Sequence, residues 1–160
     1  MKLAVTIFIV VVLFIGVILL SRTGKHNDIS FKHFYTLSEL PIITLQNNGK
    51  KLNFIIDTGA NQSVINKRDL HNYVYKEVYD KQYLLGIDGI KRKITALVDM
   101  ELTRDKQVFK ERFQVHDISA SLDTIGNAYG VEVNGIIGTA FLKNHKCILD
   151  FKDLVIHTKQ

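Results

Sequence analysis

The stretch NFIIDTGANQSVI, Asn53 to Ile65, decides the fold, because an apolar strand runs directly into a carboxylate and the chain then returns to apolar residues. Phe54–Ile56 is aromatic and β-branched, which is typical of a buried strand. Asp57-Thr58-Gly59-Ala60 follows as a tight turn of small residues. An aspartate at this place is either a simple turn cap or a functional group, and the rest of the chain decides between the two.

Short strands and turn signals fill the chain around this stretch and predict a mostly β fold. Asn48-Gly49 and Asp88-Gly89 are strong hairpin signals, and each lies between two apolar runs. Thr139–Asn144 has the length for one short helix. The strands that we expect are Leu40–Leu45, Leu52–Ile56, Val74–Leu85, Ile90–Met100, Val108–Val115, Val131–Ile137, and a closing hairpin of Lys146–Phe151 and Leu154–His157.

Three motifs occur in a fixed order along this pattern. They are Asp57-Thr58-Gly59-Ala60, then Gly86-Ile87-Asp88-Gly89, then Gly135-Ile136-Ile137-Gly138 leading into Thr139–Leu142. Together they resemble the retropepsin-like aspartic proteases, over roughly Leu40 to Ile156. The resemblance implies a closed-barrel acid protease fold and a peptide substrate.

The same resemblance implies a role for each motif. Asp57 is the catalytic residue, with Thr58, Gly59 and Ala60 as its support, and Ile136, Ile137 and Gly138 form the second-motif strand. Gly86, Ile87, Asp88 and Gly89 form a flap tip over an extended peptide, where the glycines allow the flap to move. No metal and no other cofactor is implied.

The chemistry of peptide hydrolysis explains why an aspartate is needed here. Water that attacks a carbonyl needs one group to accept its proton and another to donate one. Two carboxylates that share a proton do both, because like charges about 4 Å apart repel by roughly 4 kcal/mol at an effective dielectric of 20. Gly59 lets backbone N–H groups approach the carboxylate. Ala60 offers no hydroxyl to it, so we expect a working pH between mildly acidic and neutral.

The chain carries one copy of this motif. The only other Asp-Thr pair, Asp123-Thr124, continues with Ile125 and has no apolar lead-in. A chain of 160 residues is also too short for two such lobes. The second carboxylate must therefore come from a second copy, so we predict a homodimer with a two-fold axis through the site.

Two features depart from the family pattern. Retroviral members usually follow the late glycine with arginine, whereas Gly138 is followed by Thr139 and Ala140. The ion pair that would brace this turn is therefore absent. Asp88 adds a charge to the flap tip, although Asp-Gly remains suitable for a hairpin.

The first residues predict a membrane anchor. Leu3–Leu20 contains 18 residues without a charge, and as a helix it would span about 27 Å, close to the roughly 30 Å core of a bilayer. A secretory signal has a shorter apolar segment and a small-residue cleavage site, which Ser21-Arg22-Thr23 does not supply. We expect residues 1–21 to be a transmembrane anchor in contact with membrane lipid, residues 22–37 a tether, and residues 38–160 the protease domain.

Charge decides the expected side of the membrane only weakly, because basic residues flank the segment on both sides. The short tail before it favours a single-pass protein whose soluble domain lies on the extracytoplasmic side.

Composition argues against several other functions. The 21 Lys+Arg and 16 Asp+Glu residues are interleaved, which is typical of a solvated surface and not of a nucleic-acid interface. The single cysteine, Cys147, excludes an internal disulfide and reads as a buried structural thiol. The six histidines have no metal-binding spacing. The alternative that stays open is a non-catalytic module of the same fold that binds a peptide or partner at the membrane.

Overall fold

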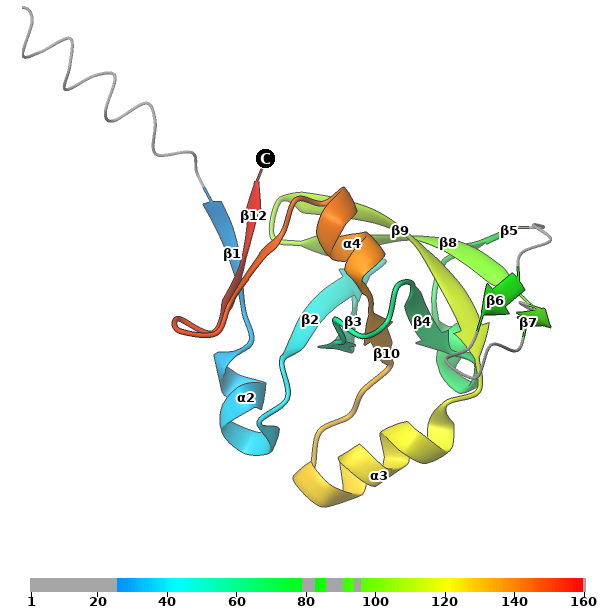
Figure 1. Cartoon of the computed structure of the whole chain (residues 1–160), viewed down its shortest axis with the longest axis horizontal. Coiled ribbons are helices and arrows are strands. Elements are labelled where there is room, and N and C mark those ends of the chain that lie inside the picture. The colour runs from blue at the N-terminus through cyan, green and yellow to red at the C-terminus, as the bar shows by residue number, and fades with distance from the viewer. Residues whose placement is uncertain (1–25, 79–82, 86–90, 94–95, 160) are drawn as a thin grey trace, which may run out of the picture.

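A computed structural model describes residues 26–78, 83–85, 91–93 and 96–159 (Figure 1). The strands are β1 His26–Ser30, β2 Ile42–Asn47, β3 Lys50–Ile56, β4 Ser63–Asn66, β5 Lys76–Val78, β6 Tyr83–Leu85, β7 Lys91–Lys93, β8 Leu97–Arg104, β9 Gln107–His116, β10 Gly135–Ile137, β11 Ile148–Asp150 and β12 Val155–Lys159. The helices are α2 Lys32–Ser38, the 3-10 helix η1 Lys67–Asn72, α3 Ser119–Tyr129 and α4 Thr139–Asn144.

The main sheet closes into a six-stranded barrel. Its strand order is β2-β3-β10-β4-β9-β8, and β8 returns to β2 through the pairing of Thr103 with Gln46. β5 adds to the first residues of β8. The fold is therefore mostly β and barrel-like, as the sequence predicts.

The barrel core is aromatic and aliphatic. Phe54 of β3 stacks on Phe113 of β9, with ring centroids 5.5 Å apart, and both side chains are fully buried. The β2–β3 hairpin turns at Asn48 and Gly49, whose φ angles of 48° and 80° are the left-handed pair that an Asn-Gly turn adopts. This predicted hairpin is confirmed.

β10 is inserted between the two halves of the Asp57 stretch. It runs parallel to β3 and antiparallel to β4, so that Ile136 lies opposite both Ile55 and Val64. Gly135 lets the strands approach, because a Cβ there would clash with the Val64 carbonyl oxygen. The predicted strand Val131–Ile137 is shorter than expected, since only its last three residues are extended in the sheet.

A second sheet, with strand order β1-β12-β11, joins the two ends of the described chain (Figure 1). Ile29 of β1 and Ile156 of β12 are register partners, and both side chains are buried in the main core. Within residues 22–37, the predicted tether, His26–Ser30 forms β1 and α2 begins at Lys32. The predicted hairpin of β11 and β12 is confirmed.

The helices differ from the expectation of one. α4 coincides with the predicted Thr139–Asn144, but α2 and α3 were not predicted. α3 packs Leu122 against buried Ile42 of β2, in a small second core with Val131 and Val133. The predicted helix Thr139–Asn144 is therefore confirmed, and the expectation that it would be the only one is wrong.

The predicted flap and the predicted anchor fall largely outside the described residues. β6 and β7 pair antiparallel, with Leu85 opposite Lys91, which agrees with a hairpin there, while the tip at 86–89 lies outside the described part. Residues 1–21 also lie outside it. Among the helices that the structure describes, none is long and apolar enough to cross a membrane.

Candidate active site

Asp57 lies immediately after β3, and its backbone is fixed by the neighbouring strand. Its N–H donates to the Ile137 carbonyl oxygen at 3.0 Å, and its own carbonyl oxygen accepts from the Ala60 N–H at 3.2 Å. The residue itself is exposed. The barrel therefore holds the backbone of Asp57 in place, while the residue as a whole stays exposed.

The turn after Asp57 brings a backbone donor to the carboxylate. The Gly59 N–H donates to Asp57 Oδ1 at 2.8 Å. A Cβ at position 59 would lie 3.2 Å from the same oxygen, which is tighter than ordinary packing. The absence of a side chain at Gly59 therefore allows its backbone N–H to approach the Asp57 carboxylate. Thr58 is exposed beside Asp57.

The start of α4 braces the other side of this turn. The Ala60 carbonyl oxygen accepts from the Thr139 N–H at 2.8 Å and from Thr139 Oγ1 at 3.2 Å. The Ala140 N–H donates to the Asn61 carbonyl oxygen at 3.0 Å. These hydrogen bonds brace the turn at the place where this chain lacks the ion pair of the retroviral members.

Gly138 is required at the centre of this arrangement. A Cβ there would lie 2.7 Å from the backbone of Gln62 and 2.9 Å from the Ala60 carbonyl oxygen. The second-motif strand and the Asp57 turn are therefore in backbone contact. Ile137 is buried, and Ile136 is half-buried.

Two polar residues under the turn were not predicted as part of the site. Ser63 Oγ accepts from the Gly138 N–H at 3.2 Å and donates to Glu111 Oε1 at 2.8 Å. Burial raises the pKa of Glu111 above its ordinary value, the hydrogen bond from Ser63 opposes that rise, and the charge of Asp99 adds to it. The sequence carried a signal for Glu111, because it takes the inward position between Phe109 and Phe113 in an alternating strand.

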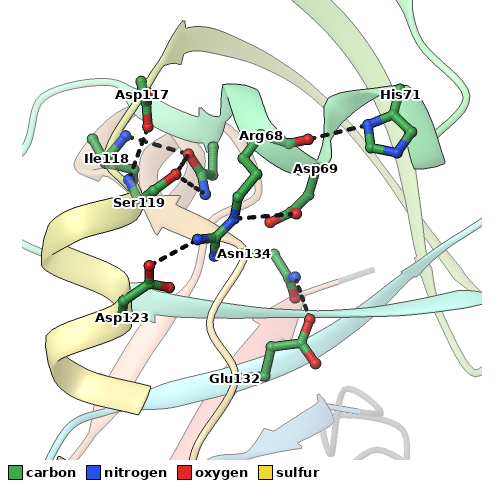
Figure 2. A network of polar contacts seen from close by, with 10 residues as sticks. Arg68, Asp69, His71, Asp117, Ile118, Ser119, Asp123, Glu132 and Asn134 are labelled. Carbon is green, nitrogen blue, oxygen red and sulfur yellow. Dashed lines mark hydrogen bonds and ion pairs between the residues drawn. The ribbon is translucent and has the colours of Figure 1, made fainter. Parts of the chain in front are cut away.

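Asp123, the other aspartate that precedes a threonine, has a different environment. It lies on α3, where its Oδ2 accepts from Arg68 Nη1 at 2.8 Å (Figure 2). This hydrogen bond holds the pKa of Asp123 below its ordinary value. At the start of the same helix, Asn66 Oδ1 accepts a hydrogen bond from the Ile118 N–H, and Asp117 Oδ1 accepts one from the Ser119 N–H. Asp123 therefore serves to fix α3 against η1.

Cys147 does not have the properties of a nucleophile. Burial raises the pKa of the Cys147 thiol to about 11, and this side chain packs against the core. Among the described residues, no three His, Cys, Asp or Glu side chains are grouped so that they could hold a metal ion.

The chain is similar to known proteins in its sequence profile and in its fold. The sequence profile of the retroviral aspartyl protease family matches residues 37–150. Among solved structures, the chain is similar to the EIAV protease in complex with the inhibitor HBY-793, at 21% identity and a TM-score of 0.51, over 73% of this chain and 98% of that one.

Two further solved structures were found, with lower scores. One is a retropepsin-like aspartic protease from Rickettsia conorii, at 19% identity and a TM-score of 0.49, over 84% of this chain and 90% of that one. The other is the retroviral protease-like domain of Ddi1 from Leishmania major, at 16% identity and a TM-score of 0.48, over 76% and 94%. No curated protein matches the sequence significantly. From the profile match over most of its length, the chain belongs to the retroviral aspartyl protease family.

Proposed function

We propose that the protein is an aspartic endopeptidase that acts as a homodimer, with one Asp57 carboxylate from each copy. The observation that carries the proposal is an exposed Asp57 on a turn held rigidly by β10 and α4. An exposed carboxylate at the end of a fixed strand can meet its counterpart across a two-fold axis. Of the two aspartates that precede a threonine, Asp57 is the one that can do so, since Asp123 is engaged with Arg68.

The reaction needs no group beyond the two carboxylates and water. One ionised Asp57 takes a proton from water, whose oxygen attacks the peptide carbonyl carbon, while the protonated partner donates to the carbonyl oxygen. The tetrahedral adduct then collapses: the Asp57 that took the proton from water gives it to the amine nitrogen as the C–N bond breaks, and one hydroxyl proton of the adduct returns to the partner Asp57. The N–H of Gly59, which donates to Asp57 Oδ1, orients the carboxylate for these steps.

The remaining predictions complete the proposal. Residues 86–89 are the flap tip that covers an extended peptide, in keeping with the antiparallel β6–β7 pair on either side. Residues 1–21 anchor the protein in a membrane as a single-pass segment, with the protease domain on the extracytoplasmic side. Confinement to a membrane surface raises the effective concentration of the two copies and favours the dimer.

The deciding experiment compares the two aspartates that precede a threonine. Asp57→Asn should lower kcat on a peptide library by on the order of 10⁴-fold, and leave the dimer intact by sedimentation. Asp123→Asn is the matched control, because it makes the same change at an exposed ion pair outside the Asp57 turn, and such pairs contribute little to stability. Cleavage that survives Asp57→Asn contradicts the proposal. A folded wild-type dimer that binds peptides without cleaving any would instead establish the non-catalytic binding module.

A further inference from the structure

The barrel contains a carboxylate at a position where an apolar side chain is expected. Glu111 lies on β9 between the buried residues Phe109 and Phe113, and it is 6% exposed. Burying an ionisable group costs free energy unless it gains a specific partner. A leucine would fill an inward strand position without that cost, so a role for the Glu111 carboxylate must come from its hydrogen bonds.

The donor and acceptor roles in the two hydrogen bonds of Ser63 are fixed. The Gly138 N–H can only donate, so Ser63 Oγ accepts from it at 3.2 Å. The Ser63 hydroxyl proton is then directed to Glu111 Oε1 at 2.8 Å. Ser63 is fully buried, so its hydroxyl has no bulk water as an alternative partner. The carboxylate therefore sets the orientation in which Ser63 can accept from Gly138.

Gly138 joins both sides of the turn that carries Asp57. The residue before it, Ile137, accepts the Asp57 N–H, and the residue after it, Thr139, donates to the Ala60 carbonyl oxygen. A shift of Gly138 moves both contacts together. Displacements of about 1 Å far from the reacting atoms can lower a rate by about 100-fold.

We propose that Glu111 is a positioning residue of the active site, which orients Ser63 and thereby holds Gly138 and the Asp57 turn in the reactive geometry. This rests on the proposed peptidase function. The charged groups around Glu111 are Asp99 and Glu101 from β8 and Lys110 and Arg112 from β9, with which it lines a pocket of about 580 Å³. Asp99 contributes a like charge, which raises the pKa of Glu111 and gives no reason for a carboxylate at this position.

The test uses the full chain and separates hydrogen bonding from charge and size. Glu111→Gln keeps an oxygen that accepts from Ser63, whereas Glu111→Leu keeps the size and removes the acceptor. Glu101→Leu is the control, since it makes the same change at an exposed residue of the same pocket. For each variant, kcat, KM and the hydrogen exchange rate of the Gly138 amide are measured.

We expect Glu111→Leu to lower kcat about tenfold or more, with KM changed less than about threefold, and to speed exchange at Gly138. Glu111→Gln should restore most of kcat and of the protection. In a Ser63→Ala background, Glu111→Leu should have no further effect on kcat, because the link is already broken. Should Glu111→Leu fail to fold, Ser63→Ala still tests the hydrogen bond from Gly138 to Ser63 through which Glu111 is proposed to act, since it removes only one oxygen atom.

Normal kcat in Glu111→Leu, or unchanged Gly138 exchange in both Glu111→Leu and Ser63→Ala, would overturn the inference. An inactive wild type is a separate outcome. It would contradict the proposed peptidase function, and Gly138 exchange would then decide by itself whether Glu111 holds the turn.

Discussion

The N–H of Asp57 donates to the carbonyl oxygen of Ile137 across 3.0 Å. This hydrogen bond links two motifs that lie far apart in the sequence, the Asp-Thr-Gly turn and the apolar strand that precedes Gly138. Because β10 runs parallel to β3, both strands end at the same edge of the sheet, and the two turns pack on each other there. The site is thus one backbone unit, and changes in either motif are expected to affect both.

Gly138→Ala tests the contact between these turns. A Cβ at 138 would lie 2.7 Å from the backbone of Gln62, which has no flexible end that can move away. We expect a loss of roughly 1–3 kcal/mol in the free energy of unfolding, and lower kcat. Denaturant unfolding and peptide cleavage measure the two effects. Gly126→Ala in α3 is the control, since its Cβ would lie an ordinary 3.6 Å from the Val131 carbonyl oxygen and alanine favours a helix. Equal losses of stability at both sites would refute the expected clash at Gly138.

Ala60→Ser tests the expected working pH. Residue 60 follows the Asp57 turn directly, and a serine hydroxyl there can donate to the carboxylates and favour their ionised form. We expect the acidic limb of the kcat/KM profile to move down by roughly 0.5 to 1 pH unit. Ala120→Ser, an exposed change on α3, should leave the limb in place. An unmoved limb in Ala60→Ser would show that position 60 does not set the working pH.

Asn47→Ala tests how the barrel is closed. The buried Asn47 amide donates to the Val74 and Glu101 carbonyl oxygens at 2.9 and 3.0 Å and accepts from the Val74 N–H at 2.7 Å. Removing it leaves these backbone groups without that partner, so we expect a loss of about 1–3 kcal/mol in unfolding experiments. Asn127→Ala, exposed on α3, should change stability by no more than about 0.5 kcal/mol. A similar loss of stability in Asn47→Ala and Asn127→Ala would mean that Asn47 does not contribute to closing the barrel.

His157 predicts a pH dependence of the terminal sheet. Its Nδ1 lies 2.7 Å from Asp28 Oδ1 and its Nε2 lies 3.6 Å from Asp150 Oδ2. The hydrogen bond with Asp28, first of all, raises the pKa of His157 above 6.5. The stabilisation is therefore complete below about pH 6.5 and is lost as the pH rises through the higher folded pKa. NMR titration of the imidazole and melting at about pH 6 and about pH 8.5 measure this.

Asp28→Asn should flatten this pH dependence, because it removes the charge that favours the protonated imidazole. Asp153→Asn is the control, since Asp153 offers its backbone N–H to Asp150 in the adjoining turn. Melting that is equally pH-dependent in wild type and Asp28→Asn would contradict the assignment.

Local patterns in the sequence predicted the parts of the fold that local chemistry determines. Asn48-Gly49 predicts its hairpin because asparagine and glycine tolerate positive φ. The Asp57 turn and the strand ending in Gly138 were identified as two parts of one site, which the structure brings into contact. The flap tip at residues 86–89 lies outside the described residues and stays a prediction.

Elements that depend on distant partners were not predicted. β1 has a single apolar residue known to be buried, Ile29, and is held by β12 at the other end of the chain. α3 contains Gly126 and several polar residues that weaken a helix by themselves, and its apolar side is stabilised by packing on Ile42. Glu111 could be suspected from its inward position, but its partner Ser63 becomes evident only when β4 and β9 are seen side by side.

The pairing of β1 with β12 also determines where the chain can be shortened safely. A fragment that starts at residue 38, the boundary expected from the sequence, would lack β1 and leave Ile156 without the cover of Ile29. β12 would then present an open strand edge to other molecules, which is a known route to aggregation. Soluble preparations of the domain should therefore begin no later than His26.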